Sequence, residues 1–186
     1  MSFRAFISVD LDPNPLLENF SKALKNTGAP LKAVRMDQIH MTLKFLGDTD
    51  ESLVPKIEGV MEEAVRTARP FEVGYKGTGA FPNMRYIKVV WIGLVNSGPL
   101  AQISEFLDNE LHPLGFKREG RRFSPHITIG RLKGSKGKED IQEILSKTRD
   151  ADFGAQMVDR LRLKKSILEK SGPVYSTLAE VPFPTS

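Results

Sequence analysis

The same order of predicted elements occurs twice along this chain of 186 residues, and that repetition most limits the folds open to it. In the first pass, apolar and polar residues alternate over 3–10 as in a β-strand, and residues 12–15 (Asp-Pro-Asn-Pro) supply a turn and a helix start. Apolar residues then recur at helical spacing from Leu16 to Leu24. A second strand, 39–46, follows.

The second pass repeats this order from residue 87. Residues 87–92 predict a strand, and 96–99 (Asn-Ser-Gly-Pro) predict a turn that opens a helix. An apolar stripe at helical spacing runs over 100–111, and the next predicted strand begins at His126. The interval from Pro15 to His40 in the first pass nearly equals the interval from Pro99 to His126 in the second.

A helix and a strand follow each of these histidine-bearing strands. The helices are predicted over 51–68 and 138–148, the strands over 71–73 and 153–155, and a last strand over 174–181. The sequence therefore predicts an α+β fold: one bilobal domain whose two pseudo-symmetric lobes, approximately 1–82 and 83–186, each combine antiparallel sheet with helices around a central cleft. The two histidine-bearing strands would face one another across that cleft.

Two of the three histidines open the same pattern, His-x-Thr-apolar, at His40 and His126. Side chains two residues apart on a strand project to the same face, so Thr42 would share a face with the first histidine and Thr128 with the second. The intervening apolar residues would anchor each strand in the core. His112 lacks the pattern and is left out of the predicted site.

Two imidazoles beside two hydroxyls suit displacement at phosphorus. Imidazole titrates near neutral pH, so one ring can accept a proton while the other donates one. Threonine hydroxyls can donate hydrogen bonds to the non-bridging oxygens of a phosphate. Arg131 would face away from Thr128 under strict alternation, unless the strand ends or bulges at Gly130.

Composition narrows the class of protein further. There are no cysteines, which removes thiolate nucleophiles and cysteine-based zinc sites. The net charge of +4 is consistent with a polyanionic partner, and basic residues surround the second motif; those before it are Lys117, Arg118, Arg121 and Arg122. A solvated loop rim is the other explanation of that cluster. No apolar run approaches the length of a membrane span, and the N-terminus lacks a signal-peptide pattern, so we expect a soluble, cytoplasmic protein.

Several other residues allow two interpretations. If the polyanionic partner is RNA, Lys44 could contact its backbone, and Phe6 and Phe45 could stack on a base, although core packing suits both rings better. The glycine-rich run 74–79 matches no phosphate-binding loop and predicts a bent strand or loop. Asp10-Leu11-Asp12 predicts a turn better than a metal site.

The two motifs, the opening Phe3-Arg4-Ala5-Phe6-Ile7 and the run from Ser124 to Arg131 resemble the two-histidine phosphoesterase superfamily. More narrowly, they resemble its archaeal and bacterial RNA 2′,3′-cyclic phosphodiesterase branch, historically called 2′-5′ RNA ligase. The resemblance spans essentially the whole chain. It implies a bilobal fold with a central groove, no metal and no cofactor. It also implies an activity that opens a terminal 2′,3′-cyclic phosphate of RNA, tRNA fragments included, to a 2′-phosphate.

The resemblance also implies roles for individual residues. His40 would be the general acid that protonates the departing O3′, and His126 would be the base that activates water. Thr42, Thr128 and Arg131 would bind the phosphate. Three alternatives stay open: a 2′-5′ RNA ligase that joins tRNA halves, a non-catalytic RNA-binding module with structural histidines, and a metallohydrolase, for which the ligands are too few. We expect a monomer.

Overall fold

The computed structural model describes residues 2–120, 122–169 and 172–185, so Arg121 of the basic cluster lies outside the described residues. Its α-helices are α1 (Pro15–Asn26), α2 (Val54–Val65), α3 (Gly98–Leu111) and α4 (Lys138–Lys147). Its strands are β1 (Ser2–Asp10), β2 (Leu31–Ala33), β3 (His40–Asp50), β4 (Phe71–Asn83), β5 (Tyr86–Val95), β6 (His126–Leu132), β7 (Asp152–Val158), β8 (Arg160–Glu169) and β9 (Gly172–Pro182). Short 3₁₀ turns lie at Met36–Gln38, Glu51–Leu53 and His112–Leu114.

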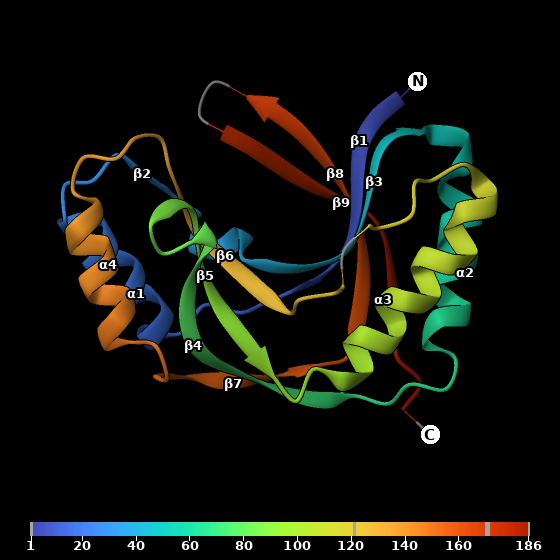
Figure 1. Cartoon of the computed structure of the whole chain (residues 1–186). Coiled ribbons are helices and arrows are strands. Elements are labelled where there is room, and N and C mark those ends of the chain that lie inside the picture. The colour runs from blue at the N-terminus through green and yellow to red at the C-terminus, as the bar shows by residue number, and fades with distance from the viewer. Residues whose placement is uncertain (1, 121, 170–171, 186) are drawn as a thin grey trace.

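The strands form two antiparallel sheets (Figure 1). The four-stranded sheet has the order β3-β1-β8-β9, and the five-stranded sheet has the order β2-β6-β5-β4-β7. The predicted α+β fold is therefore confirmed. Each sheet draws strands from both halves of the sequence, because β8 and β9 complete the sheet of β1 and β3. The predicted boundary at residue 82 falls near the end of β4, and the internal duplication stays a prediction.

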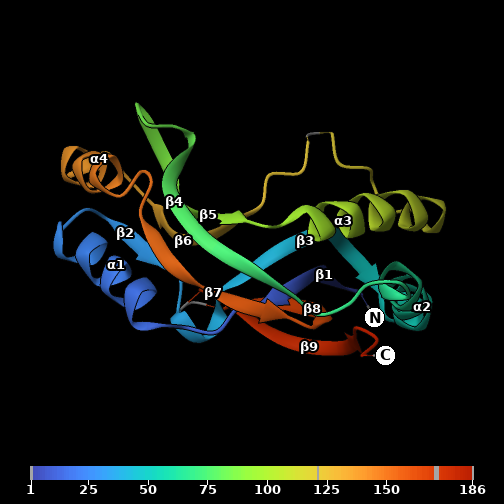
Figure 2. The ribbon, with the colours of Figure 1, turned by 90° about the horizontal axis from the view of Figure 1, so that it is seen from below.

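The helices pack in pairs at opposite sides of the molecule, α1 with α4 and α2 with α3 (Figures 1 and 2). Helix α1 begins where the sequence indicated: the Asn14 side chain accepts a hydrogen bond from the Leu17 N–H at 3.0 Å, and Pro15 occupies the first turn. Its buried face carries Leu17, Phe20 and Leu24, which join one continuous apolar core. No helix within the described ranges is long and apolar enough to cross a membrane.

The main differences from the sequence prediction concern strands. β2 and β8 were not predicted, and β3 and β4 extend further than the patterns indicated. The glycine-rich run 74–79 lies inside β4, where Gly79 leaves room for a neighbouring ring: a Cβ at this position would overlap the Trp91 indole. Glycine thus weakened the strand signal at the point where close packing requires it.

Candidate active site

The two histidine motifs adopt the same local structure on different sheets. His40 is the first residue of β3 and His126 the first residue of β6. In both motifs the histidine and threonine are partly exposed while the second and fourth residues are buried: Met41, Leu43, Ile127 and Ile129. The predicted sharing of one face by histidine and threonine is therefore present in each strand.

A β-bulge follows the threonine in both strands. The register between β1 and β3 shifts at Leu43, and the register between β5 and β6 shifts at Ile129, so each of these residues is left without a partner across the ladder. The carbonyl of Leu43 accepts a hydrogen bond from the Ser104 hydroxyl at 2.7 Å, and that of Ile129 from the Val34 N–H at 2.8 Å. Both bulges thus keep their buried carbonyl groups satisfied.

The bulges change which side chains face outward. Alternation is interrupted for one residue, so Lys44 and Gly130 are buried and the next residues, Phe45 and Arg131, are exposed on the side of the histidine and threonine. The suggestion that Lys44 contacts RNA is wrong. Its side chain is only 1% exposed and donates to the Asp108 carboxylate at 2.6 Å.

Both imidazoles are held in the same tautomer. Nδ1 of His40 lies 2.8 Å from the Gln38 carbonyl oxygen, and Nδ1 of His126 lies 2.7 Å from the Ser124 carbonyl oxygen. A carbonyl oxygen only accepts, so Nδ1 of each ring must be the donor. Nε2 is then left to exchange a proton with a bound molecule.

Aromatic rings pack against His40. The Phe6 ring lies 4.9 Å from the imidazole, and Tyr175 of β9 meets it edge-on at 5.2 Å. Phe6 is buried, as expected for core packing, but it lies outside the continuous apolar core and packs against His40 and Tyr175. Phe45 is 63% exposed, contrary to the preference for core packing. Tyr175 was not singled out from the sequence, because no local pattern indicates that β9 returns beside β8 in the sheet of β1 and β3.

Charged groups also lie near His40. Asp10 pairs with this histidine across β1 and β3, and its carboxylate accepts a hydrogen bond from Lys164 at 2.6 Å. Arg162 adds a second ion pair to the same carboxylate at 3.1 Å. The carboxylate is therefore fixed beside the ring by two cations from β8.

His126 has a different environment. Its ring lies 4.9 Å from Phe81, edge-on, and 6.3 Å from Trp91. Its partner across β5 and β6 is Gly93, which brings no charge. Each histidine thus makes the same kind of hydrogen bond to a backbone carbonyl, but the two differ in their charged neighbours.

Electrostatics connect the two histidines through Arg131. Burial lowers the pKa of both imidazoles, the hydrogen bonds to Gln38 and Ser124 oppose that change, and the positive charge of Arg131 lowers both pKa values further. Asp10 raises the pKa of His40, whereas Lys164 lowers it. Since one arginine acts on both rings and β3 contacts β6, the structure brings the two motifs and Arg131 to one region.

Metal ligands do not gather in the described part of the chain. Among residues 2–120, 122–169 and 172–185, no group of three or more His, Asp or Glu side chains is arranged to hold a metal ion.

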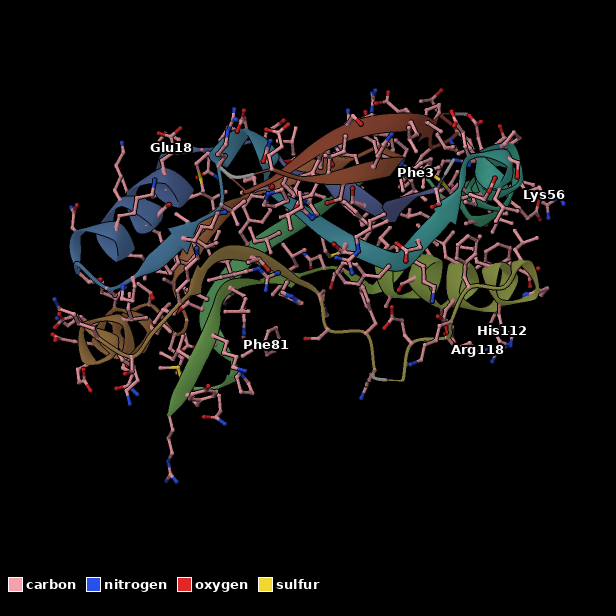
Figure 3. All side chains as sticks on the ribbon, turned by 90° about the horizontal axis from the view of Figure 1, so that it is seen from above. Phe3, Glu18, Lys56, Phe81, His112 and Arg118 are labelled. Atoms are coloured by element: carbon pink, nitrogen blue, oxygen red, sulfur yellow. The ribbon has the colours of Figure 1, made fainter. Side chains whose placement is uncertain are left out.

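The third histidine, His112, lies away from the two motifs. Its Nδ1 donates to the Phe116 carbonyl oxygen, 3.1 Å away, at the end of α3 far from Phe81 (Figure 3).

Two histidines with matching geometry, on strands of two sheets and near one arginine, have the features of an acid–base site for an anionic molecule. Comparison with known proteins gives the particular family. The family sequence model of the 2′-5′ RNA ligase superfamily matches residues 13–166, and the chain belongs to this superfamily.

Relatives resemble the chain over nearly its whole length. An RNA 2′,3′-cyclic phosphodiesterase of Methanothermobacter thermautotrophicus is 37% identical over 181 residues, covering 96% of this chain and 97% of its own. One from Methanocaldococcus jannaschii is 35% identical, covering 95% and 99%. Among solved structures, a Thermus thermophilus protein has a TM-score of 0.77 at 26% identity, covering 98% of each chain. E. coli LigT complexed with 3′-AMP has a similar fold, with a TM-score of 0.75, 21% identity and coverage of 98% and 99%.

Proposed function

We propose that the chain hydrolyses the 2′,3′-cyclic phosphate at the end of an RNA to a 2′-phosphate, without a metal ion, with His40 and His126 as the acid–base pair. The observation that carries the proposal is the matched pair of imidazoles, each bonded through Nδ1 to the carbonyl two residues earlier and each within reach of the Arg131 charge. The names of the relatives at 35% and 37% identity support the cyclic phosphate of RNA as the substrate.

The reaction uses Nε2 of both rings. Neutral His126 accepts a proton from water as the water oxygen forms a bond to phosphorus, and protonated His40 donates a proton to O3′ as the P–O3′ bond breaks. The 2′-phosphate remains, and the two rings return to their starting states by exchanging protons with solvent. Asp10 supports the assignment of His40 as the acid, because a carboxylate beside an imidazole favours its charged form.

The remaining proposed residues bind the phosphate. The Thr42 and Thr128 hydroxyls donate to its non-bridging oxygens, and the guanidinium of Arg131 balances the charge that develops during attack. The bulge at Ile129 supports this role for Arg131, because it turns the side chain to the face of Thr128. We further propose that the chain acts as a monomer in the cytoplasm and that tRNA fragments are among its substrates.

The test is product identification from an oligonucleotide that ends in a 2′,3′-cyclic phosphate, in the presence of excess chelator. We expect a 2′-phosphate with the wild-type chain and none with His40→Gln or His126→Gln. A 3′-phosphate product, or full activity of the double variant, would contradict the proposed roles. Formation of a 2′-5′ linkage with an added 5′-hydroxyl RNA would identify a ligase. Binding of RNA without turnover would identify an RNA-binding module. Activity that only zinc restores would identify a metallohydrolase.

A further inference from the structure

A strip of aromatic and basic side chains continues from His126 along the β4–β5 hairpin. Phe81 and Trp91 form its inner end, since both rings lie next to His126. Tyr86 and Lys88 form its outer end, where the Lys88 ammonium lies 5.2 Å from the centre of the Tyr86 ring. None of these four side chains takes part in the proton transfers proposed above.

The pairing of the hairpin places both ends of the strip on one face. Phe81 and Asn83 are two residues apart on β4 and share a face, and Tyr86 is the partner of Asn83 across the ladder. Lys88 is the extra residue of a bulge between β4 and β5, and its contact with the Tyr86 ring sets it on that same face. At about 3.3 Å per strand residue, the strip extends about 16 Å from Trp91 to Tyr86.

The outer end of the strip is exposed but well supported. Tyr86 is 60% exposed on a hairpin that projects from the body of the molecule (Figure 2). Helix α4 holds the hairpin from the side: Gln142 donates to the Met84 carbonyl at 2.5 Å, and Lys138 to the Arg85 carbonyl at 3.4 Å. An exposed aromatic ring beside a cation on such a support presents a binding surface rather than a loose tip.

We propose that this strip binds the single-stranded RNA that precedes the terminal nucleotide, and the inference rests on the proposed function. A tyrosine ring can stack on a base of any sequence, and the neighbouring lysine can neutralise a phosphate. Protein surfaces that bind single strands without sequence preference combine these two groups. The strip would then make this chain favour oligonucleotides over nucleoside 2′,3′-cyclic monophosphates, which are too short to reach its outer end at Tyr86 and Lys88.

The experiment compares two substrates, an oligonucleotide with a 2′,3′-cyclic phosphate end and a nucleoside 2′,3′-cyclic monophosphate. For Tyr86→Ala we expect kcat/KM on the oligonucleotide to fall by about tenfold. For Lys88→Ala we expect a smaller fall in kcat/KM on the oligonucleotide. The slope of the logarithm of its binding constant against the logarithm of salt concentration should also be shallower, by about one. Both variants should hydrolyse the mononucleotide at the wild-type rate. Tyr86→Phe, which keeps the ring, should retain the oligonucleotide preference.

Lys56→Ala is the matched control for the loss of a positive charge, because Lys56 lies on α2, far from Phe81 (Figure 3). The Lys56→Ala variant should have the wild-type kcat/KM on both substrates. Equal kcat/KM for the Tyr86→Ala/Lys88→Ala double variant and the wild-type chain on the oligonucleotide would overturn the strip while leaving the phosphodiesterase in place. A parallel loss on both substrates would also overturn it. A wild-type chain inactive on both substrates would overturn the proposed function itself, and the strip with it.

Discussion

Phe45 on β3 and Arg131 on β6 occupy equivalent positions, five residues after His40 and His126 respectively and two residues after a bulge. Both are exposed on the side of their histidine. One strand thus offers an apolar ring where the other offers a guanidinium. Two strands with the same backbone course therefore place side chains of different chemistry at equivalent positions of the site.

The pH dependence of kcat/KM should reflect the lowered pKa values of the two histidines. In the proposed reaction the active form has His126 neutral and His40 protonated, and burial holds both pKa values below the usual 6.5. We therefore expect the maximum of kcat/KM below pH 6.5, with loss at higher pH as His40 gives up its proton and loss at lower pH as His126 gains one.

Replacing Arg131 should move that profile. Arg131→Gln removes a positive charge that lowers the pKa of both imidazoles, so both limbs should shift to higher pH. Activity at the new maximum should still fall, by about 10²-fold or more, because the donor that we propose for the phosphate is lost. A profile that keeps the wild-type limbs would show that the guanidinium acts on neither ring.

Removing either reactive imidazole should abolish most turnover. His40→Gln and His126→Gln should each lower kcat by about 10²–10⁴-fold, and the double variant should lose little more, because both groups act in one step. The control is His112→Gln, since that histidine bonds to the Phe116 carbonyl at the end of α3. An equal loss of kcat in the control would point to a general effect on folding.

The buried ion pair of Lys44 and Asp108 should have unequal effects on stability when either partner is replaced. Lys44 is 1% exposed and also donates to the Lys117 carbonyl, whereas the Asp108 side chain is 21% exposed and accepts from the Glu119 N–H as well. Asp108→Asn leaves a buried ammonium without its counter-charge and should lower the free energy of unfolding by about 3 kcal/mol. Lys44→Met leaves a carboxylate that water can reach, so its cost should be about 1 kcal/mol.

Urea denaturation followed by the fluorescence of the one tryptophan, Trp91, measures both changes. The order of the two losses is the test, because a surface ion pair would give two small and similar values. If Lys44→Met proved the more harmful change, the ammonium would be stabilised by something other than Asp108.

Two glycine replacements should change the free energy of unfolding in opposite directions. Gly79→Ala places a Cβ against the Trp91 indole and should lower both the free energy of unfolding, by about 2 kcal/mol, and the activity, because the indole lies near His126. Gly59→Ala, on α2, meets no atom within 4 Å and should stabilise the chain by about 0.5–1 kcal/mol. Thermal unfolding and kcat, measured on both variants, separate a local clash from a general glycine effect.

Much of the fold could be predicted because its signals are local. The helix start at Asn14, the apolar stripe of α3 and the two histidine-bearing strands each lie within one short segment. β8 was missed because its outward residues are cations, among them Arg162 and Lys164, which are balanced by Asp10 from the other end of the chain. A pairing over such a distance leaves no local pattern.

The site was predicted in part for the same reason. His-x-Thr on a strand fixes a shared face, so the arrangement within each motif followed from spacing alone. The burial of Lys44 and the outward turn of Arg131 depend on bulges, and a bulge is set by the partner strand rather than by the residues themselves. Tyr175 reaches His40 only because β9 returns beside β8.

Because β8 and β9 finish the sheet that begins with β1, the surface around His40 cannot assemble during synthesis until residues 160–182 have left the ribosome. A chain stopped before residue 160 would carry both histidines and still lack Tyr175, Lys164 and Arg162. The order in which the chain is made thus delays completion of the surface around His40, and a prematurely ended product should be inert rather than partly active.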